Sequence, residues 1–291
     1  MIPYLMRLLD VTMNNNAIPD DWKNAIVVPI YKGGDRTVGE NYRQASLTSV
    51  VCKQMEHLIV GYLRQFWETS GRLNDGQHGF KPGYSCGSQV VTVCKDITDT
   101  LDEGDRTDAI IIDFSKAFDL FLHDRMFTKI EATGVDLRVV VWVKEFLLGR
   151  SQRVRVDVQL SEEVRVISGV LKGSVLCPPI FLAYVNNIWR NNESNIRLFA
   201  DYCIVYRKRT DSSDIDKLQT DINRLGEWAV ESEMKTNPGK IKAVSFTKAR
   251  VKERIRYYFG DKLILEASNF KYLRIIICSD LNWADHVNYT L

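Results

Sequence analysis

The sequence predicts an α+β fold in which helices pack behind an antiparallel sheet, and two apolar segments carry this prediction. Residues 196–206 have the pattern of a β-hairpin, because two short apolar runs flank a turn at Asp201. Residues 109–113 have the pattern of a buried strand, because four apolar residues run directly into Asp113. Helical periodicity elsewhere supplies the covering layer, with residues 215–229 as the clearest example. Each of the two segments therefore carries a carboxylate at a strand end.

The N-terminal part of the chain is expected to form helices around one strand. An amphipathic helix over residues 4–13 precedes a turn that docks Trp22, and a strand follows at 25–31. Apolar residues at helical spacing predict a core helix from residue 50 to 66, with Leu58 and Tyr62 among its buried positions. Ser85 has the character of an N-cap for a helix that continues to residue 104.

Two groups of basic residues are candidates for contact with nucleic-acid phosphates. One group surrounds Gly33 and Gly34 and has the composition of a flexible phosphate-contacting loop. The other alternates with Val154 and Val156, which predicts charges on one face of a strand. For each group, a solvated basic surface explains the pattern equally well. The first group is Lys32, Arg36, Arg43 and Lys53, and the second is Arg150, Arg153 and Arg155.

The remaining elements follow from local patterns. Helices are expected at 123–133 and 136–148, and a glycine-containing loop leads into an apolar helix over 169–187. Such a loop suits a close approach of backbone to a base pair, or an ordinary glycine-capped turn. A strand is expected within 237–246, a hairpin at 257–265 and a last strand at 272–277. His78 is interpreted as a hydrogen-bonded packing residue, because a lone histidine is more often that than a ligand.

The composition limits the functional classes without choosing one. The chain has 291 residues, 45% of them hydrophobic, which suffices for one large domain or two packed subdomains. Its net charge of +2 does not by itself indicate nucleic-acid binding, so such binding depends on where the basic residues lie. Six scattered cysteines without metal-ligand spacing favour free thiols in an intracellular protein. The sequence shows neither a signal peptide nor a membrane span, so no membrane partner is expected.

Asp113 and Asp201 together have the character of a divalent-cation site. Mg²⁺ prefers oxygen ligands and completes its octahedral shell with water and substrate phosphates. Two ions roughly 4 Å apart can stabilise the attacking and the leaving oxygens of a phosphoryl transfer. Two unrelated buried acids would give the same sequence pattern.

Several motifs, in order along the chain, resemble those of reverse transcriptases from non-LTR (LINE, jockey-like) retrotransposons. The resemblance extends from residue 18 to residue 287, and the shared order makes it more specific than any single motif. The palm motifs are Asp113-Phe114-Ser115-Lys116-Ala117-Phe118-Asp119, Ser168-Gly169-Val170-Leu171-Lys172-Gly173-Ser174-Val175-Leu176 and Phe199-Ala200-Asp201-Tyr202. Further motifs are Val28-Pro29-Ile30-Tyr31-Lys32-Gly33-Gly34-Asp35, Asn41-Tyr42-Arg43, Gln77-His78-Gly79-Phe80-Lys81-Pro82-Gly83, Asn237-Pro238-Gly239-Lys240 and Lys271-Tyr272-Leu273.

The resemblance implies a polymerase palm with fingers. It assigns an N-terminal helix to residues 1–17, a fingers-like region to 18–105 and a palm-like region to 106–287. No segment resembles the family's endonuclease, and a thumb is expected to be absent. The implied activity is RNA-directed DNA polymerisation by two-metal nucleotidyl transfer, with Mg²⁺ or Mn²⁺ as the metal. The expected location is intracellular, in the nucleus or the cytoplasm. The implied partners are an RNA template, a DNA primer and a dNTP, and the oligomeric state stays open.

The resemblance also assigns roles to single residues. Phe118 would exclude a ribose 2′-hydroxyl, and Lys240 would protonate or pair with the departing pyrophosphate. The implied catalytic residues are Asp113, Asp201 and Lys240, and the implied metal site is Asp113, Phe114 and Asp201. The implied nucleotide-binding residues are Lys32, Arg43, Phe114, Phe118, Lys172 and Gly173. Arg150, Arg153 and Arg155 are the implied nucleic-acid-binding residues.

The chain departs from the family at several special positions. The family's hairpin has two consecutive aspartates, whereas Tyr202 follows Asp201, and a neutral phenol is a poor Mg²⁺ ligand. Lys172 replaces a glutamine beside the incoming nucleotide and cannot accept a hydrogen bond. Pro179 is tolerable only in a first helical turn, and Arg274, where the family has glycine, only without a positive φ. These changes favour an alternative function, that of a catalytically inactive nucleic-acid-binding remnant.

Overall fold

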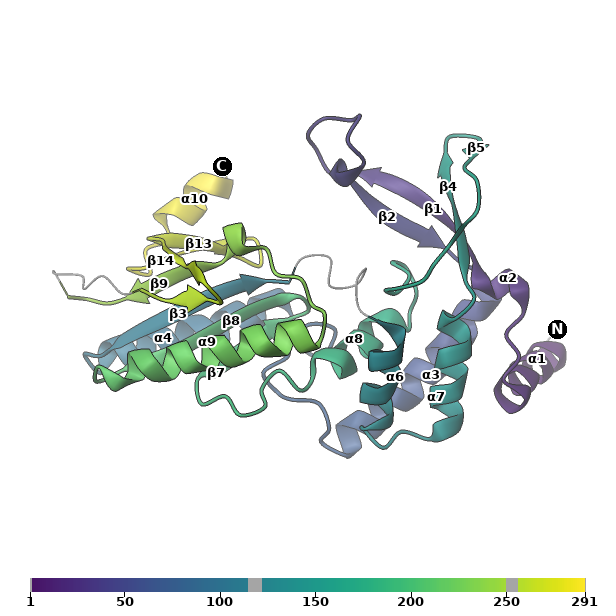
Figure 1. Cartoon of the computed structure of the whole chain (residues 1–291), viewed down its shortest axis with the longest axis horizontal. Coiled ribbons are helices and arrows are strands. Elements are labelled where there is room, and N and C mark those ends of the chain that lie inside the picture. Colours follow the sequence, from purple (N-terminus) through teal and green to yellow (C-terminus); the bar gives the residue numbers. More distant parts are fainter. Residues whose placement is uncertain (1, 115–121, 250–255, 291) are drawn as a thin grey trace. The chain divides into compact units, whose positions relative to one another are not determined.

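The computed structural model describes residues 2–114, 122–249 and 256–290, and the chain divides into two compact units. Unit 1 comprises Met1–Leu73 and Phe118–Val185, and unit 2 comprises Asn74–Ala117 and Asn186–Leu291. The colours in Figure 1 show that each unit combines two separate stretches of sequence. The division differs from the expected contiguous regions, because residues 74–105 pack with strands that come much later in the chain. The assignment of fingers and palm to particular ranges stays a prediction.

Unit 2 is built around a five-stranded sheet whose pairing is mostly antiparallel. The strands are β3 (Arg106–Asp113), β7 (Asn195–Phe199), β8 (Tyr202–Arg209), β9 (Lys242–Phe246) and β12 (Leu265–Glu266). β3 lies in the centre, antiparallel to β8 on one side and to β9 on the other, while β12 runs parallel to β9. The isoleucines of β3 are buried on both faces of the sheet, which explains their continuous apolar run.

Two long helices cover the faces of this sheet. α4 (Cys86–Asp102) buries Ile97 in a core cluster with Ile111 of β3, and Ser85 caps it in a reciprocal capping box with Ser88. α9 (Ser213–Glu231) packs against β8 on the other face of the sheet. Successive side chains of a strand point to opposite faces, so Ile110 points to the face of α9 whereas Ile111 points to that of α4. Figure 1 shows α9 in front of the strands and α4 behind them. The α+β class and the helical layer expected from the sequence are confirmed.

The C-terminal part of unit 2 contains two hairpins where the sequence predicted one hairpin and one strand. β10 (Tyr258–Phe259) and β11 (Lys262–Leu263) form the expected hairpin. The strand expected at 272–277 is wrong: β13 (Asn269–Tyr272) and β14 (Ile275–Cys278) pair antiparallel around a two-residue turn, and α10 (Ala284–Thr290) follows. The turn residues Leu273 and Arg274 have φ angles of 49° and 74°. Because neither residue type favours a positive φ, the sequence carried no turn signal.

Arg274→Gly is expected to stabilise the protein by about 1 kcal/mol, since an L-residue with positive φ costs ~1–2 kcal/mol that glycine avoids. Arg274 is the better choice in this turn because it is exposed, whereas Leu273 packs against the core cluster. The measurement is thermal unfolding, where this gain corresponds to a rise of about 2–4 °C. The control is Arg155→Gly, which lies in a strand with negative φ and should lower the midpoint. A lower unfolding midpoint for Arg274→Gly than for the parent chain would refute the claim that the positive φ of Arg274 strains the backbone.

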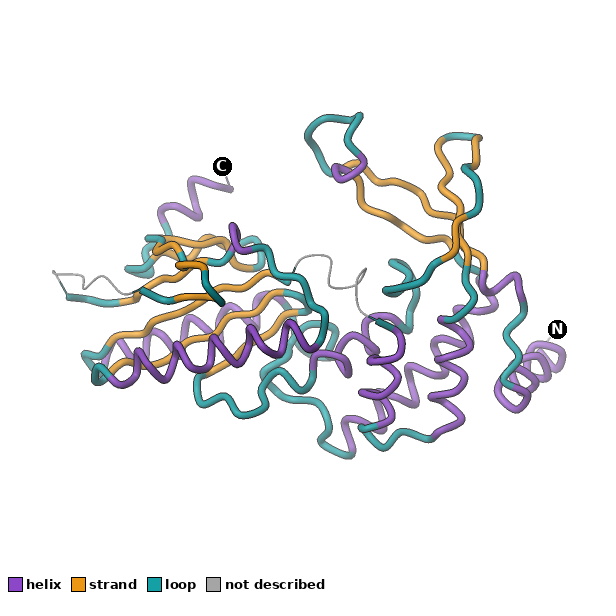
Figure 2. The backbone as a smooth tube through the Cα atoms, viewed as in Figure 1, coloured by secondary structure: helices purple, strands orange, loops and turns teal. Residues whose placement is uncertain are grey.

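Unit 1 combines a helical part with a second sheet, as Figure 2 shows. This sheet has five strands. The sheet follows the order β2-β1-β4-β5, with β6 paired to β4, and β1 and β4 run parallel. Its strands are β1 (Asn24–Tyr31), β2 (Tyr42–Leu47), β4 (Ser151–Val156), β5 (Gln159–Leu160) and β6 (Val164–Arg165). The helices are α1 (Ile2–Asn15), α2 (Asp20–Lys23), α3 (Val50–Thr69), α6 (His123–Glu131), α7 (Leu137–Leu147) and α8 (Cys177–Val185).

The apolar stripe of α3 is narrower than the sequence suggested. Met55 and Ile59 are buried as expected, but Leu58 is 58% exposed and Tyr62 is 39% exposed. Successive residues of a helix are rotated by about 100°, so Leu58 falls on the flank of the stripe that Ile59 occupies. The expectation that Leu58 and Tyr62 belong to the core is therefore wrong.

α8 places Pro179 in its first turn, which is the only helical position at which this proline is expected from the sequence to be tolerated. It begins at Cys177, so Pro179 lies in the first turn, where the absent N–H has no helical partner to lose. Across the described ranges, none of the helices combines the length and the apolar character needed to cross a membrane.

Candidate active site

The two predicted carboxylates lie on adjacent strand ends of unit 2. Asp113 is the last residue of β3 and pairs in register with Tyr202, the first residue of β8. The N–H of Phe114 donates to the carbonyl oxygen of Asp201 at 3.1 Å, which ties the end of β3 to the β7–β8 turn. Both aspartates are partly buried. The pairing of β3 with β8 therefore brings together the two acids that the sequence singled out.

The turn that carries Asp201 is held by Gln77, a residue whose role the sequence did not reveal. Ala200 has a φ of 54°, and its N–H donates to the buried Gln77 Oε1 at 3.2 Å. The same oxygen accepts from the N–H of Gly79 at 2.8 Å. A Cβ on Gly79 would lie 2.3 Å from the Ala200 nitrogen, so only glycine fits beside the turn. The family resemblance included this segment, but only the structure shows that it supports the turn.

His78 is buried and packs its ring against Tyr84, with ring centroids 4.3 Å apart. Its backbone N–H donates to the carbonyl of Leu198, next to the Asp201 turn. Burial lowers the pKa of His78, and the charges of Arg197 and Lys81 lower it further. The ring packing agrees with the interpretation of His78 as a packing residue, but the ring Nδ1 has no hydrogen-bond partner among the described residues, so the expected hydrogen bond is not found for this atom.

Lys240 reaches Asp113 from a short 3₁₀ turn, η2 (Pro238–Lys240). Its Nζ lies 2.9 Å from Asp113 Oδ2, and its side chain remains 59% exposed. The hydrogen bond to Asp113 raises the pKa of Lys240, so the ammonium form is favoured. The Asn237 side chain accepts from the N–H of Gly239 and shapes this turn. The structure therefore brings the three predicted catalytic residues together.

Tyr202 faces this group from the start of β8 and is 37% exposed. Burial raises the pKa of its phenol, and the charges of Asp113 and Asp201 raise it further. The phenol therefore stays neutral over the physiological range, as a poor ligand for a hard cation.

Phe114 contributes backbone rather than side chain to this site. Its ring is 2% exposed and packs edge-on against Trp228, with centroids 5.6 Å apart. A role of Phe114 in a metal site would therefore rest on its carbonyl oxygen. Phe118 lies outside the described residues.

The oxygen atoms at these strand ends are potential ligands for the divalent cation that the resemblance implies. Mg²⁺ is commonly bound by one or two carboxylates, with water and substrate phosphates as the other ligands. Asp113, Asp201 and the Phe114 carbonyl fit one such ion, provided that Lys240 leaves Asp113. Within the described part of the chain there is no cluster of three or more acidic, histidine or cysteine side chains that could hold a metal. The donor set of Asp113, Asp201 and the Phe114 carbonyl therefore fits one open cation site of this kind.

The predicted nucleotide-binding residues outside the strand ends belong to unit 1. Lys32 and Arg43 are exposed in the β1–β2 hairpin, where the N–H of Lys32 donates to the carbonyl of Asn41. Lys172 and Gly173 lie in the loop before α8, and the Lys172 carbonyl accepts from the N–H of Ser46 at 2.7 Å. Because these residues and the two aspartates lie in different units, their approach to one nucleotide stays a prediction.

Of the three arginines expected on one strand face, Arg150 does not lie there. It precedes β4, is 1% exposed, and donates to the carbonyls of Phe146 and Trp22 at 2.7 Å each. Residues 150 and 153 are separated by an odd number of positions, so they cannot share a strand face. Burial lowers the pKa of Arg150, while nearby Cys52 and Glu56 act in the opposite direction. The expectation that Arg150 faces nucleic acid is therefore wrong.

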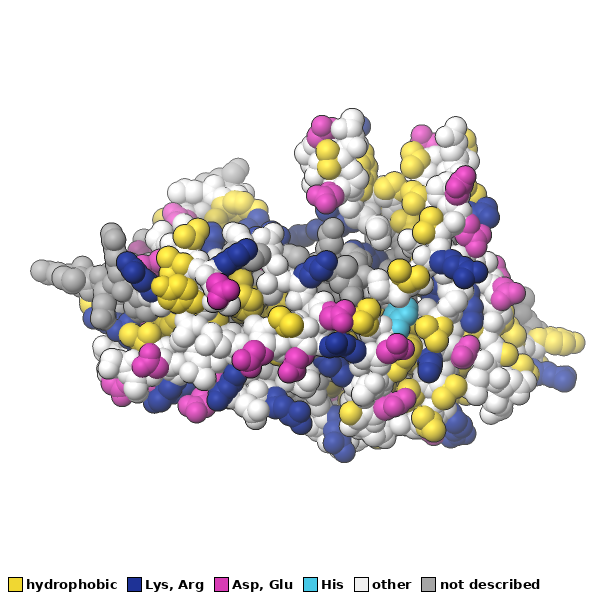
Figure 3. Space-filling model, viewed as in Figure 1, with side chains coloured by type: hydrophobic (Ala, Val, Ile, Leu, Met, Phe, Trp, Pro, Cys, Tyr) yellow, Lys and Arg dark blue, Asp and Glu magenta, His cyan; other side chains and the backbone are white. Residues whose placement is uncertain are grey.

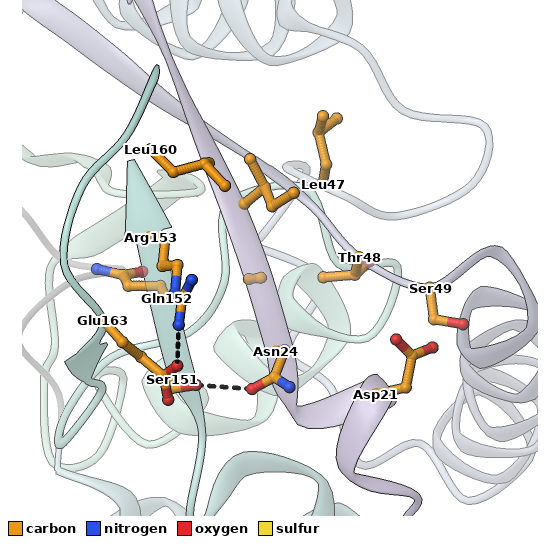
Figure 4. A pocket seen from close by; sticks show the side chains of 12 residues that line it. Asp21, Asn24, Leu47, Thr48, Ser49, Ser151, Gln152, Arg153, Leu160 and Glu163 are labelled. Carbon is orange, nitrogen blue, oxygen red and sulfur yellow. Dashed lines mark hydrogen bonds and ion pairs between the residues drawn. The ribbon is translucent and has the colours of Figure 1, made fainter. Parts of the chain in front are cut away.

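Arg153 and Arg155 are exposed on β4. Arg153 bonds to Glu163 at 3.0 Å. Figure 4 shows this pair beside a cavity of about 470 Å³ that is lined by residues of β1, β2, β4 and β5 among others. In the same view, Ser151 bonds to Asn24 across the two strands. On the face seen in Figure 3, dark blue Lys and Arg side chains alternate with magenta Asp and Glu, in keeping with the small net charge.

Comparison with known families identifies the group of proteins to which the chain belongs. The sequence profile of the family described as "Reverse transcriptase (RNA-dependent DNA polymerase)" matches residues 30–277. The chain belongs to the reverse transcriptase family. The matched range includes both strand-end aspartates, Tyr202 and Lys240, so the site lies within the part that defines the family.

The relatives of this reverse transcriptase chain come from non-LTR transposons. It is 28% identical to "Probable RNA-directed DNA polymerase from transposon X-element" of Drosophila melanogaster, with 96% of this chain and 32% of the relative covered. It is 24% identical to "RNA-directed DNA polymerase from mobile element jockey" of Drosophila funebris, with 98% and 32% covered. The chain thus spans about a third of the length of these relatives.

A solved structure supports the reverse transcriptase fold. Apo telomerase from Candida tropicalis, truncated from its C-terminal domain, matches with a TM-score of 0.62 at 11% identity. The match covers 96% of this chain and 59% of the telomerase chain. At this identity the similarity concerns the fold alone.

Proposed function

We propose that this chain is the RNA-directed DNA polymerase domain of a non-LTR retrotransposon and that unit 2 carries its catalytic centre. The supporting observation is the meeting of Asp113 and Asp201 at adjacent strand ends, with Lys240 bonded to Asp113. The substrates are an RNA template, a DNA primer and a dNTP. In this proposal, unit 1 supplies the fingers-like basic hairpin that contains Lys32 and Arg43.

In the proposed reaction, the primer 3′-hydroxyl attacks the α-phosphorus of the dNTP. A P–O bond forms to the primer, the bond to the α,β-bridging oxygen breaks, the hydroxyl proton passes to water, and pyrophosphate leaves. Asp113, Asp201 and the Phe114 carbonyl would hold Mg²⁺ or Mn²⁺, which lowers the pKa of the hydroxyl and neutralises phosphate charge. In the two-metal arrangement of the family, Tyr202 occupies the place of a further carboxylate.

The other residues of this chain bind and orient the nucleotide in the proposal. Lys240 pairs with or protonates the departing pyrophosphate after its ammonium moves away from Asp113. Lys32, Arg43 and Lys172 contact the triphosphate as charge-assisted donors. Gly173 allows close approach to the base pair, and Phe118 excludes a 2′-hydroxyl. Arg153 and Arg155 contact the template backbone.

Asp113→Asn is expected to abolish Mg²⁺ binding and RNA-templated primer extension, because an amide cannot replace the carboxylate that Mg²⁺ prefers. Isothermal titration of the folded chain with MgCl₂ measures the first effect without any need for turnover. Asp261→Asn, in an exposed turn of unit 2, is the matched control and should leave the titration unchanged. An unaltered titration in Asp113→Asn would remove this residue from the cation site.

A second candidate function is a catalytically inactive, nucleic-acid-binding remnant. Two contacts favour it. The neutral Tyr202 stands opposite Asp113, and the Lys240 ammonium neutralises Asp113 without any cation. Such a chain would bind an RNA–DNA duplex and leave the primer unextended.

Duplex affinity is expected to fall steeply with salt under either function, because phosphate contacts release counterions with a slope of about −0.9 per contact. Arg155→Ala should reduce the magnitude of this slope by about one contact, since Arg155 is exposed on β4. Arg7→Ala, exposed on α1, is the control and should not change it. Anisotropy titrations at several salt concentrations give the slope. An affinity independent of salt would indicate that these basic residues are merely solvated.

A further inference from the structure

The loop at residues 169–176 of unit 1 is held from three different elements. The His123 ring on α6 contacts the Gly169 carbonyl at 2.7 Å, and the N–H of Ser46 on β2 donates to the Lys172 carbonyl. Gly173 has a φ of 121°, and a Cβ there would lie 2.7 Å from the Ser46 carbonyl oxygen. The loop is thus pressed against β2 at the position where only glycine fits.

The third contact comes from Glu56, an acid in the middle of α3. Its side chain is fully buried, and its Oε2 accepts three hydrogen bonds from the end of the loop. The donors are the N–H of Val175 at 2.7 Å, the N–H of Leu176 at 3.1 Å and the Ser174 hydroxyl. Val175 and Leu176 immediately precede α8, so a carboxylate from another helix performs the task of an N-cap.

A buried carboxylate is a costly way to stabilise a fold. Its other oxygen, Oε1, has no nitrogen or oxygen partner among the described residues. The thiol of neighbouring Cys52 is neutral. Burial is the main cause that raises its pKa to about 12, and the negative charge of Glu56 adds to the effect. Such groups are weak contributors to net stability, but they select one arrangement of the donors that they bind. The arrangement selected here is the backbone path of residues 171–176 at the end of the loop.

We infer that Glu56 is a positioning residue that fixes the loop at residues 171–176 and thereby the place from which Lys172 meets the nucleotide triphosphate. The first half concerns the loop alone, and the second half rests on the proposed polymerase function. Lys172 is partly buried and follows Leu171, which is buried, so its side chain direction depends on the backbone path that Glu56 holds.

Four variants separate hydrogen bonding from charge and from general destabilisation. Glu56→Met keeps the length and removes the acceptor, whereas Glu56→Gln keeps an acceptor oxygen and removes the charge. Glu68→Met, exposed on the same helix, is the matched control. Ser174→Ala removes a single donor and serves if Glu56→Met fails to fold.

The first measurement is amide hydrogen exchange at Val175 and Leu176, compared with Val27 of β1 as an internal reference. We expect exchange at both loop amides to rise at least about tenfold in Glu56→Met, with Val27 unchanged, and to stay near the parent rate in Glu56→Gln and Glu68→Met. Ser174→Ala should give a smaller rise at the same amides. Unchanged loop exchange in Glu56→Met, or an equal rise in Glu56→Gln, would overturn a positioning role based on hydrogen bonding.

The second measurement is the affinity for a fluorescent dATP in the presence of Mg²⁺. We expect Glu56→Met to weaken it about tenfold, with recovery in Glu56→Gln, because a displaced Lys172 no longer presents its ammonium to the phosphates. If the parent chain does not bind dATP while Glu56→Met still frees the loop amides, the polymerase proposal fails and the fixing of the loop stands. If the parent binds dATP and Glu56→Met binds it equally well, the link to Lys172 is refuted.

Discussion

Tyr202→Asp is expected to raise RNA-templated primer extension by about a thousandfold over the parent chain. Restoring a carboxylate opposite Asp113 supplies the ligand that the family's hairpin has there. A gain of about 4 kcal/mol in transition-state stabilisation corresponds to this factor. Adding Lys172→Gln should increase the rate at saturating dNTP further, while the loss of the Lys172 ammonium weakens the affinity for dNTP. The two gains in rate need not be additive, because both changes address the same nucleotide.

The control for this gain is Tyr258→Asp, a tyrosine at the start of β10 that is 42% exposed against 37% for Tyr202. It adds the same charge to unit 2 and should not raise the rate. A second readout requires no turnover: two carboxylates in register repel, so Tyr202→Asp should unfold at lower temperature without Mg²⁺ and gain more from its addition than the parent does.

Two outcomes would contradict this account of Tyr202. If the parent chain extends a primer as fast as Tyr202→Asp, the missing carboxylate is not needed for catalysis. If neither Tyr202→Asp nor its combination with Lys172→Gln extends a primer, while both proteins remain folded and bind duplex, the function as an inactive remnant is favoured over the function as a polymerase.

Arg150→Met is expected to destabilise unit 1 by about 3–5 kcal/mol. The guanidinium of Arg150 donates to the carbonyls of Trp22 and Phe146, and it lies near the fully buried Glu56. Its loss leaves two buried carbonyls unpaired and a buried carboxylate with less compensation. Methionine preserves much of the side-chain volume, so the loss reports on polar contacts more than on a cavity. Urea unfolding followed by tryptophan fluorescence measures the effect.

Arg155→Met, exposed on β4, provides the comparison and should change the free energy of unfolding by less than about 0.5 kcal/mol. For duplex affinity we expect the reverse order: Arg155→Met should weaken duplex binding, whereas Arg150→Met should leave it unchanged. A loss of duplex affinity in a fully stable Arg150→Met would restore Arg150 as a nucleic-acid contact.

The contrast between these arginines shows where sequence reasoning reached its limit. The apolar runs into Asp113 and Asp201 predicted the strands that bring the acids together, because such runs reflect burial on both faces of a central strand. The partners of Arg150 are backbone carbonyls of Trp22 and Phe146, and no residue type signals a carbonyl that needs a donor. Its burial is a tertiary property without a local pattern.

Other structural features could not be predicted from the sequence for related reasons. The β13–β14 turn uses Leu273 and Arg274 at positive φ, so the usual glycine or asparagine signal was missing. Gln77 supports the Ala200 turn through an amide oxygen that any glutamine could offer, and only the fold brings the two segments together. Phe114 could be placed in the site by its motif, but the burial of its ring against Trp228 could not be predicted.

The central position of β3 affects how the chain can fold during synthesis. Both neighbours of β3 emerge from the ribosome much later, β8 at residues 202–209 and β9 at 242–246. Until then, an isoleucine-rich strand with two open edges awaits its partners, which is the kind of segment that pairs with other chains. A premature stop codon between residues 113 and 202 would therefore give an aggregation-prone product rather than a smaller working domain. The order of strands therefore makes truncation after β3 more disruptive to this fold than the replacement of a single side chain at the end of β3.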